Sequence, residues 1–502
     1  MNKTGKNAVS NIIAKLWTMI ATYLFVPFYI NILGEESYGI VSFFATLQMA
    51  INILGLGLAN TLRREFAVNT GDKEKDNYRK KKLLNCIELI YIIISILVSV
   101  ICIVCSTPIA NNWLNIGKLE FRYVANAVAL MGISIAIQMV ASLYSGCLFG
   151  LDLQVQANVF QIIWSIAKYC GSLMVIEVVA DLRLFYLWHI ITDLIYLFIL
   201  RIYLAHKISI KERYTWSFHD FIYVKGILKY TIGILIISIV ALVNKELDKI
   251  IISGMLSLTE LGGYNLATTL GNISTVFASA MYVSVFSGFT SDISMGNKHV
   301  AEYRFLRVNK LVNITTSCMM CFLASFSIPL LEFWTRSTIY SDMLSIAAPF
   351  VVFAIGMIEF QEIPYAYALA NGNTKINVLI GIIYLPIVCV FTWIGIKNWG
   401  LLGAGLVYFL VMSTQTVIYE YLVYKKYLRY GPIKLIFKDT IIPIAFSLVL
   451  AFFSKRLIYT ISGSTIIIVM LAVLFGGLSL VIELLVLDMD LFKILIKKRR
   501  KS

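Results

Sequence analysis

Long apolar stretches with few charges constrain the fold of this chain more than any other feature of its sequence. Hydrophobic residues make up 59% of the 502 residues and charged residues only 14%, whereas a soluble protein carries roughly a quarter. Many stretches reach the ~20 residues that an α-helix needs to cross a bilayer. We therefore expect an all-α polytopic membrane protein with about 14 transmembrane helices.

The positive charges indicate on which side of the membrane each loop lies. With the N-terminus in the cytoplasm, most of the 43 Lys and Arg residues fall in cytoplasmic segments, as the positive-inside rule requires. Both termini are then cytoplasmic, and the net charge of +15 indicates membrane lipids as partners and no nucleic acid. The expected spans are residues 9–31, 39–60, 83–105, 121–146, 157–177, 183–204, 230–255, 262–287, 310–333, 345–370, 376–396, 401–424, 441–459 and 464–487.

A polar, basic segment near the middle of the chain predicts two lobes. We expect an N-terminal lobe in residues 1–204, a cytoplasmic linker in 205–229 and a C-terminal lobe in 230–424. Residues 425–502 would add two helices and a basic tail. Six spans in each lobe is an even number, which predicts two parallel six-helix repeats related by an axis along the membrane normal.

Lysines inside the expected spans are the first candidate functional residues. A charge within a spanning helix costs roughly 2.5–3.5 kcal/mol on insertion scales, so such residues usually face a cavity or a partner. We expect these cations to bind a negatively charged substrate headgroup. Within the stretch Asn244–Gly254, the alternative is self-neutralisation through Glu246 and Asp248, which lie at i,i+3 spacing from a lysine. The candidate cations are Lys15, Lys168, Lys245 and Lys249.

Polar residues recur on the same helical faces as these cations. In the first span they share one sector with Lys15, and in the fifth they lie beside Lys168. We expect these faces to line a cavity, although a threonine in a membrane helix often bonds its own backbone. The candidate lining residues are Asn11, Thr18, Thr22, Gln161, Asn265 and Asn272.

Acidic residues within the spans are candidates for binding a coupling ion, H⁺ or Na⁺. His189 and Asp193 lie at i,i+4 and would hydrogen-bond each other; alternatively, Asp193 neutralises Lys168 or acts in a proton relay. Pro364, which follows two glutamates in the tenth span, predicts a kink because it removes a helix hydrogen bond. The candidate acids are Asp193, Asp248, Glu359 and Glu362.

Known catalytic and metal-binding signatures are missing from the sequence. Cys102 with Cys105, and Cys318 with Cys321, have CxxC spacing, but no His or second pair lies nearby to complete a metal site. The eight cysteines are expected to pack as small apolar residues. The chain has no P-loop, HExxH or GxSxG motif. We therefore expect no metal, no cofactor and no enzymatic activity.

Four stretches carry a family resemblance. They are LGEESYGIVSFF, GLANTLRREFA, NKELDKIIISGMLSLTELGGYNLA and YALANGNTK. In this order they resemble the polysaccharide-unit (O-antigen type) flippases of the multidrug/oligosaccharidyl-lipid/polysaccharide exporter superfamily. The resemblance implies a bacterial cell-membrane protein with two six-helix lobes around a central V-shaped cavity, alternating access, and an optional last helix pair. It also implies a substrate, an undecaprenyl-diphosphate-linked oligosaccharide flipped from the inner to the outer leaflet.

Three other functions are weighed against this one. A lipid II flippase also combines fourteen helices with a cationic cavity, but arginines would be expected in its first two spans, where this chain has Lys15 alone. A cation-coupled multidrug antiporter of the same superfamily would need a more acidic cavity. A polymerase or lipid-linked transferase would need an acidic catalytic motif in a sizeable loop, and no outer loop is long.

The topology predicts which loops an impermeant thiol reagent reaches. Single cysteines placed at Asn112 and Ser464 should react from outside the cell, and one placed at Gly71 should not. The measurement is labelling of intact cells, with permeabilised cells as the control. Reversed labelling would overturn the orientation.

Overall fold

The computed structural model describes residues 3–67, 72–208 and 246–487, and the regular elements in this part of the chain are helices. The chain divides into two compact units. The first comprises Met1–Glu246 with Ser253–Gly262, and the second comprises Leu247–Ile252 with Gly263–Ser502. Since each unit has its own interior, each is described by itself.

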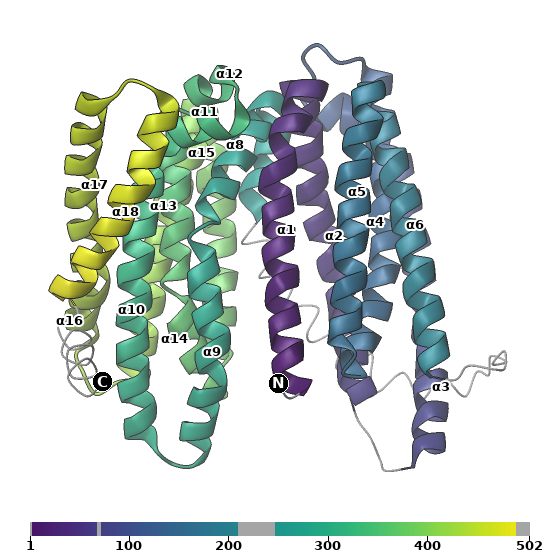
Figure 1. Cartoon of the computed structure of the whole chain (residues 1–502), viewed down its shortest axis with the longest axis horizontal. Helices are drawn as coiled ribbons and strands as arrows, with labels where there is room; N and C mark the ends of the chain where they lie inside the picture. Colours follow the sequence, from purple (N-terminus) through teal and green to yellow (C-terminus); the bar gives the residue numbers. More distant parts are fainter. Residues whose placement is uncertain (1–2, 68–71, 209–245, 488–502) are drawn as a thin grey trace. The chain divides into compact units, whose positions relative to one another are not determined.

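Unit 1 is built around one central helix, α4 (Figure 1). This helix packs against α2, α3 and α6, while α1 packs against α5. In the most apolar stretch of α4, 67% of the residues are buried, against 22% for α3. Among the described residues of unit 1, α4 contributes more buried hydrophobic side chains than any other helix. The helices are α1 (Lys3–Leu33), α2 (Glu35–Ala67), α3 (Lys73–Pro108) continuing into the π-turn η1 (Ile109–Trp113), α4 (Phe121–Gly150), α5 (Gln154–Val178) and α6 (Leu182–Lys207).

Unit 2 is organised around α10, which packs against α9, α13, α17 and α18 (Figure 1). One apolar core joins Cys318, Cys321 and Phe326 to residues of the last two helices, such as Ile458 and Ile468. Its helices are α8 (Leu258–Gly271, which begins in unit 1), α9 (Thr275–Ser294), α10 (Lys298–Ser325), α11 (Ser327–Thr335), α12 (Thr338–Met343), α13 (Ala347–Glu359), α14 (Glu362–Ala370), α15 (Lys375–Tyr427), α16 (Pro432–Ile436), η2 (Phe437–Ile441), α17 (Ile442–Ile461) and α18 (Thr465–Leu487).

Within the described residues, 10 helices are long and apolar enough to cross a membrane, or 11 if α10 and α11, bent by 70°, form one span. The helix α15 holds two of the expected spans, because Gly400 interrupts it with φ 55° and ψ −134°. Glycine adopts this left-handed conformation at little steric cost. The expected span 230–255 lies mostly outside the described residues. The prediction of an all-α multi-pass membrane protein is confirmed.

Three expected spans have breaks. The expected span 310–333 is divided between α10 and α11 at the 70° bend. The expected span 262–287 is two helices, because α8 ends at Gly271 and α9 begins at Thr275. The intervening Asn, Ile and Ser are poor helix formers, which explains a stop that hydrophobicity alone does not reveal. The helix breaks near Pro364, where the sequence predicts a kink. Residues 360 and 361 separate α13 from α14, and Pro364 has no N–H to donate to the carbonyl of residue 360.

The basic segment that precedes the third span forms the first turns of α3. Asp72 caps this helix and accepts hydrogen bonds from the backbone N–H groups of Glu74 and Lys75. These bonds, with the Lys75 bond as the larger cause, lower the pKa of the Asp72 carboxyl. A negative charge at a helix N-terminus is also favoured by the helix dipole.

The close contact between α3 and α4 gives a stability prediction. A Cβ at Gly132 would lie 2.1 Å from the Cβ of Cys102, so Gly132→Ala should destabilise unit 1 by about 1–3 kcal/mol, the usual cost of overpacking. The measurement is thermal unfolding in detergent. Gly477→Ala is the control, since no atom lies within 4 Å of that position. Equal melting temperatures for the two variants would contradict the predicted contact, and adding Cys102→Gly should rescue Gly132→Ala.

Candidate functional site

A buried ion pair lies inside unit 1. The Lys168 ammonium on α5 is 3.1 Å from Oδ1 and 3.3 Å from Oδ2 of Asp193 on α6. The two side chains are 6% and 0% exposed. Both residues lie on the faces where α5 and α6 pack together, so each charge meets the other and not lipid. Their attraction offsets part of the cost of burying two charges in a low-dielectric interior.

Three further donors complete the shell of the Asp193 carboxylate. Ser134 Oγ and Gln138 Nε2 on α4 donate to Oδ2 at 2.6 and 2.8 Å, and Trp164 Nε1 on α5 donates to Oδ1 at 3.0 Å. The Trp164 ring centroid lies 5.0 Å from the Lys168 ammonium, within cation–π range. The arrangement joins α4, α5 and α6 at one carboxylate.

The network continues to α2. Gln48 donates to the side-chain oxygen of Gln138, and the side-chain nitrogen of Gln138 donates to Asp193. Sequence analysis missed Ser134, Gln138 and Trp164. The i,i+4 spacing of Ser134 and Gln138 in an apolar span was the available signal, but it does not identify the acid that they face.

His189 does not pair with Asp193. Its ring lies among Phe44, Phe185 and Tyr186, with the Phe185 centroid at 4.2 Å. Among the described residues, neither ring nitrogen of His189 has a hydrogen-bond partner. The predicted His189–Asp193 hydrogen bond is therefore wrong. Asp193 instead neutralises Lys168, which was the alternative, because the ammonium and the α4 donors already occupy both carboxylate oxygens.

The polar residues of α1 divide into two groups. Asn11 lies against α5, where it donates to Gln154 at 2.8 Å and accepts from Asn158 at 2.6 Å. Thr18 and Thr22 bond the carbonyls one turn before them on their own helix. Such bonds satisfy a hydroxyl without a partner on another helix. Asn11 is thus part of the α1–α5 interface, and the Lys15 side chain lies outside the described set.

Gln161 lies half-buried on α5, within unit 1. In unit 2, Asp248 is buried and accepts a 2.7 Å hydrogen bond from Tyr264. Lys249 is half-buried, and Lys245 lies outside the described residues. Glu359 is buried at the end of α13, and Glu362 is half-buried at the start of α14.

The two candidate asparagines of unit 2 differ in their surroundings. Asn265 is half-buried in α8, and its backbone carbonyl accepts hydrogen bonds from Thr268 and Thr269. Asn272 is exposed at the break between α8 and α9. Its backbone carbonyl accepts from Thr275. The break therefore presents the Asn272 side chain away from a helix interface.

Two buried glutamates in unit 2 were not among the candidates. Glu420 on α15 accepts hydrogen bonds from Thr440 at 3.0 Å and from Tyr424 at 3.2 Å. The Ser447 hydroxyl on α17 donates to the Glu483 carboxylate on α18 and lies 2.8 Å from each of its two oxygens. Both lie near the ends of expected spans, a position where an acid is usually solvated. Tertiary contacts alone show that they are buried.

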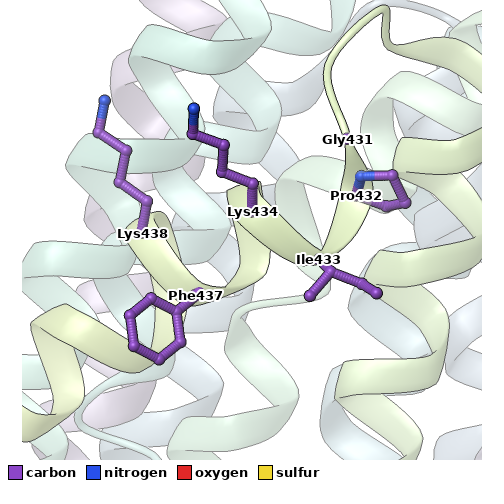
Figure 2. Close-up of a pocket in the computed structure, with 6 residues that line it drawn as sticks. All are labelled: Gly431, Pro432, Ile433, Lys434, Phe437 and Lys438. Carbon is purple, nitrogen blue, oxygen red and sulfur yellow. The ribbon is translucent and has the colours of Figure 1, made fainter.

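A short amphipathic segment precedes α17. Figure 2 shows Lys434 and Lys438, one turn apart, extending on one side of residues 431–438, with Ile433 and Phe437 on another. They border an open hollow of about 710 Å³. Ile433 is 73% exposed and Phe437 57%. Cations next to exposed apolar side chains are typical of a segment at the membrane–water interface.

No group of three or more His, Cys, Asp or Glu residues that could hold a metal ion occurs among the described residues. Five of the eight cysteines are buried: Cys86, Cys102, Cys147, Cys318 and Cys321.

Comparison with solved structures defines the fold. The lipid II flippase MurJ in an inward closed conformation is 15% identical and similar over 97% of this chain and 99% of its own, with a TM-score of 0.73. An inward-facing multidrug resistance MATE family transporter is 11% identical, with a TM-score of 0.66. The similarity covers 87% of this chain and 99% of the transporter. A MOP superfamily transporter from Pyrococcus furiosus Vc1 is 14% identical, with a TM-score of 0.57. The similarity covers 84% of this chain and 95% of the transporter.

The fold is therefore that of the MOP superfamily of flippases and transporters. A sequence model of the family described as "Polysaccharide biosynthesis protein" matches residues 4–289, more than half of the chain. The chain belongs to this family. Comparison with curated protein sequences finds no match.

The buried pair gives a prediction about stability. Lys168→Met leaves the Asp193 charge uncompensated, so it should lower the free energy of unfolding by about 3–5 kcal/mol. Adding Asp193→Asn removes that charge while keeping a side chain that can accept hydrogen bonds, so the double variant should recover much of the loss. Membrane abundance and thermal unfolding in detergent measure both.

His189→Phe is the matched control one turn away on α6. It keeps the aromatic contacts and should change stability little, because the imidazole nitrogens have no partner among the described residues. A strong loss of stability in this variant, with Lys168→Met tolerated, would contradict the assignment.

Proposed function

We propose that this protein flips an undecaprenyl-diphosphate-linked oligosaccharide repeat unit from the inner to the outer leaflet, by alternating access, for surface polysaccharide synthesis. The observation that carries the proposal is membership of the polysaccharide biosynthesis family on a fold shared with flippases. The proposed site is the bacterial cytoplasmic membrane, with both termini in the cytoplasm. The positive-inside distribution and the interfacial segment 431–438 support this placement.

The substrate headgroup carries negative charge through a low-dielectric region and needs compensating cations. Lys15, Lys245 and Lys249 are proposed as the cations that contact the diphosphate. Lys168 would join them only when its bond to Asp193 opens, because the pair is closed in this structure. The polar side chains Thr18, Thr22, Gln161, Asn265 and Asn272 are proposed to face the sugar hydroxyls, and Asn11 to order α1 against α5.

Coupling to H⁺ or Na⁺ is proposed at acids that are buried or half-buried in the described structure: Asp193, Asp248, Glu359 and Glu362. A cation that binds Asp193 competes with Lys168 for the same carboxylate. Its arrival would free the ammonium for an anionic headgroup, which links ion binding to substrate binding through one bond.

A second candidate is a lipid II flippase, favoured by the extent of the structural similarity to MurJ. The two functions differ in what deletion of the gene from its host does. A polysaccharide flippase should leave growth intact and abolish surface polysaccharide, while a lipid II flippase should arrest cell-wall synthesis. Accumulation of an organic cation in the deletion strain would instead indicate a multidrug transporter.

Substitution of the proposed headgroup lysines tests the substrate contact. Lys15→Ala and Lys249→Ala should leave membrane abundance normal and abolish export of polysaccharide, since a substrate cation contributes little to folding. Lys→Arg should retain part of the export, because a diphosphate accepts either cation. Surface polysaccharide and abundance are scored separately. Full export by both alanine variants would show that the assignment is wrong.

A further inference from the structure

A groove on unit 1 lies between three helices, away from the Lys168–Asp193 pair. Its volume is about 450 Å³. The helices α3 and α6 both pack on α4, so α4 forms the floor and the other two form the walls. Ser95 and Ser99 are the hydroxyl residues along its length. The apolar lining consists of Ile92, Ile96, Ile133, Ala136, Ile137, Val140, Leu197 and Phe198.

One end of the groove is polar and carries the ion pair of Glu88 with Arg201. Glu88 accepts hydrogen bonds from Tyr144 at 2.7 Å and from Nε of Arg201 at 2.8 Å. The Glu88 side chain is 12% exposed, whereas that of Arg201 is 56% exposed. A guanidinium has five N–H donors, and the bond to Glu88 uses one of them. Glu88 therefore fixes the orientation of Arg201, which presents further donors at the mouth of the groove.

The three polar residues occupy the same end on all three helices. Glu88 precedes the apolar lining on α3, while Tyr144 and Arg201 follow it on α4 and α6. At ~1.5 Å per residue, the floor from Ile133 to Tyr144 is roughly 16 Å long. Half of a hydrocarbon core of ~30 Å is about 15 Å. The groove thus has the length of one leaflet, with a cation at headgroup level.

We propose that this groove binds one anionic glycerophospholipid, with its phosphate on Arg201 and an acyl chain along α4. A guanidinium binds phosphate through charge-assisted hydrogen bonds, and a lipid such as phosphatidylglycerol has no headgroup cation to oppose it. The match to one leaflet favours a bilayer phospholipid over a long isoprenoid. Ile96 and Phe198 are exposed, so an acyl chain can enter the groove from the surrounding lipid. The inference does not depend on the transported substrate.

The test is native mass spectrometry of the purified full-length protein with added phosphatidylglycerol or phosphatidylcholine of the same acyl chains. Arg201→Gln should weaken binding of one phosphatidylglycerol by about tenfold, the range for losing hydrogen bonds to a charged group, and leave phosphatidylcholine unchanged. Arg183→Gln is the matched control, because Arg183 lies at the other end of α6 beside Asp181.

A second pair of variants tests the apolar part without touching Arg201. Ser99→Phe fills the groove and should reduce retention of phosphatidylglycerol. Val100→Phe, on an exposed position of α3 that does not line the groove, should not. The double variant Glu88→Gln with Arg201→Gln removes both charges and leaves no unpaired buried acid. Loss of lipid in this variant therefore does not follow from misfolding caused by an uncompensated Glu88.

Three outcomes would overturn the inference. They are equal retention of both lipids by the wild-type chain, equal loss in Arg201→Gln and Arg183→Gln, and displacement of phosphatidylglycerol by an isoprenyl phosphate at equal concentration.

Discussion

A charge inside a membrane helix must be neutralised, and in unit 1 this requirement is met by the bond between Lys168 and Asp193. Four helices contribute to it, because α5 and α6 supply the charges, α4 supplies two donors and α2 supports one of them through Gln48. The central position of α4 and the satisfied carboxylate depend on each other. Separating the pair would leave a buried acid without its counter-charge, so only a competing cation or anion makes separation inexpensive.

The same constraint is met differently in unit 2. Glu420 and Glu483 are fully buried and are bonded to hydroxyl groups. Each bond links two helices: Glu420 joins α15 to the segment before α17, and Glu483 joins α18 to α17. The last two helices are therefore attached to the rest of unit 2 by polar bonds as well as by the apolar core around Phe326.

The proposed transport cycle uses charge in the same way. Burying a cation costs less free energy when the cation is paired with an acid. The cation becomes available to a substrate when an ion binds that acid in its place. Lys168 and Asp193 have this relation in the structure, which makes them the described pair best suited to link ion binding to binding of an anionic headgroup. The exposed Arg201 has a separate role at the lipid-facing surface, where its partner Glu88 stays in place.

The sequence by itself determined the all-α membrane class, the family resemblance, most of the span positions and the helix break near Pro364, because hydrophobic length and backbone chemistry are local properties. It listed Lys168 and Asp193, since a charge in an apolar span is visible in one dimension. The sequence did not reveal which side chains hydrogen-bond with these two residues. His189 lies one turn from Asp193 yet faces aromatic rings, while Ser134 and Gln138, more than fifty residues away, bond the carboxylate. Helix packing decides which faces meet, and side-chain hydrogen bonds form only between faces that meet.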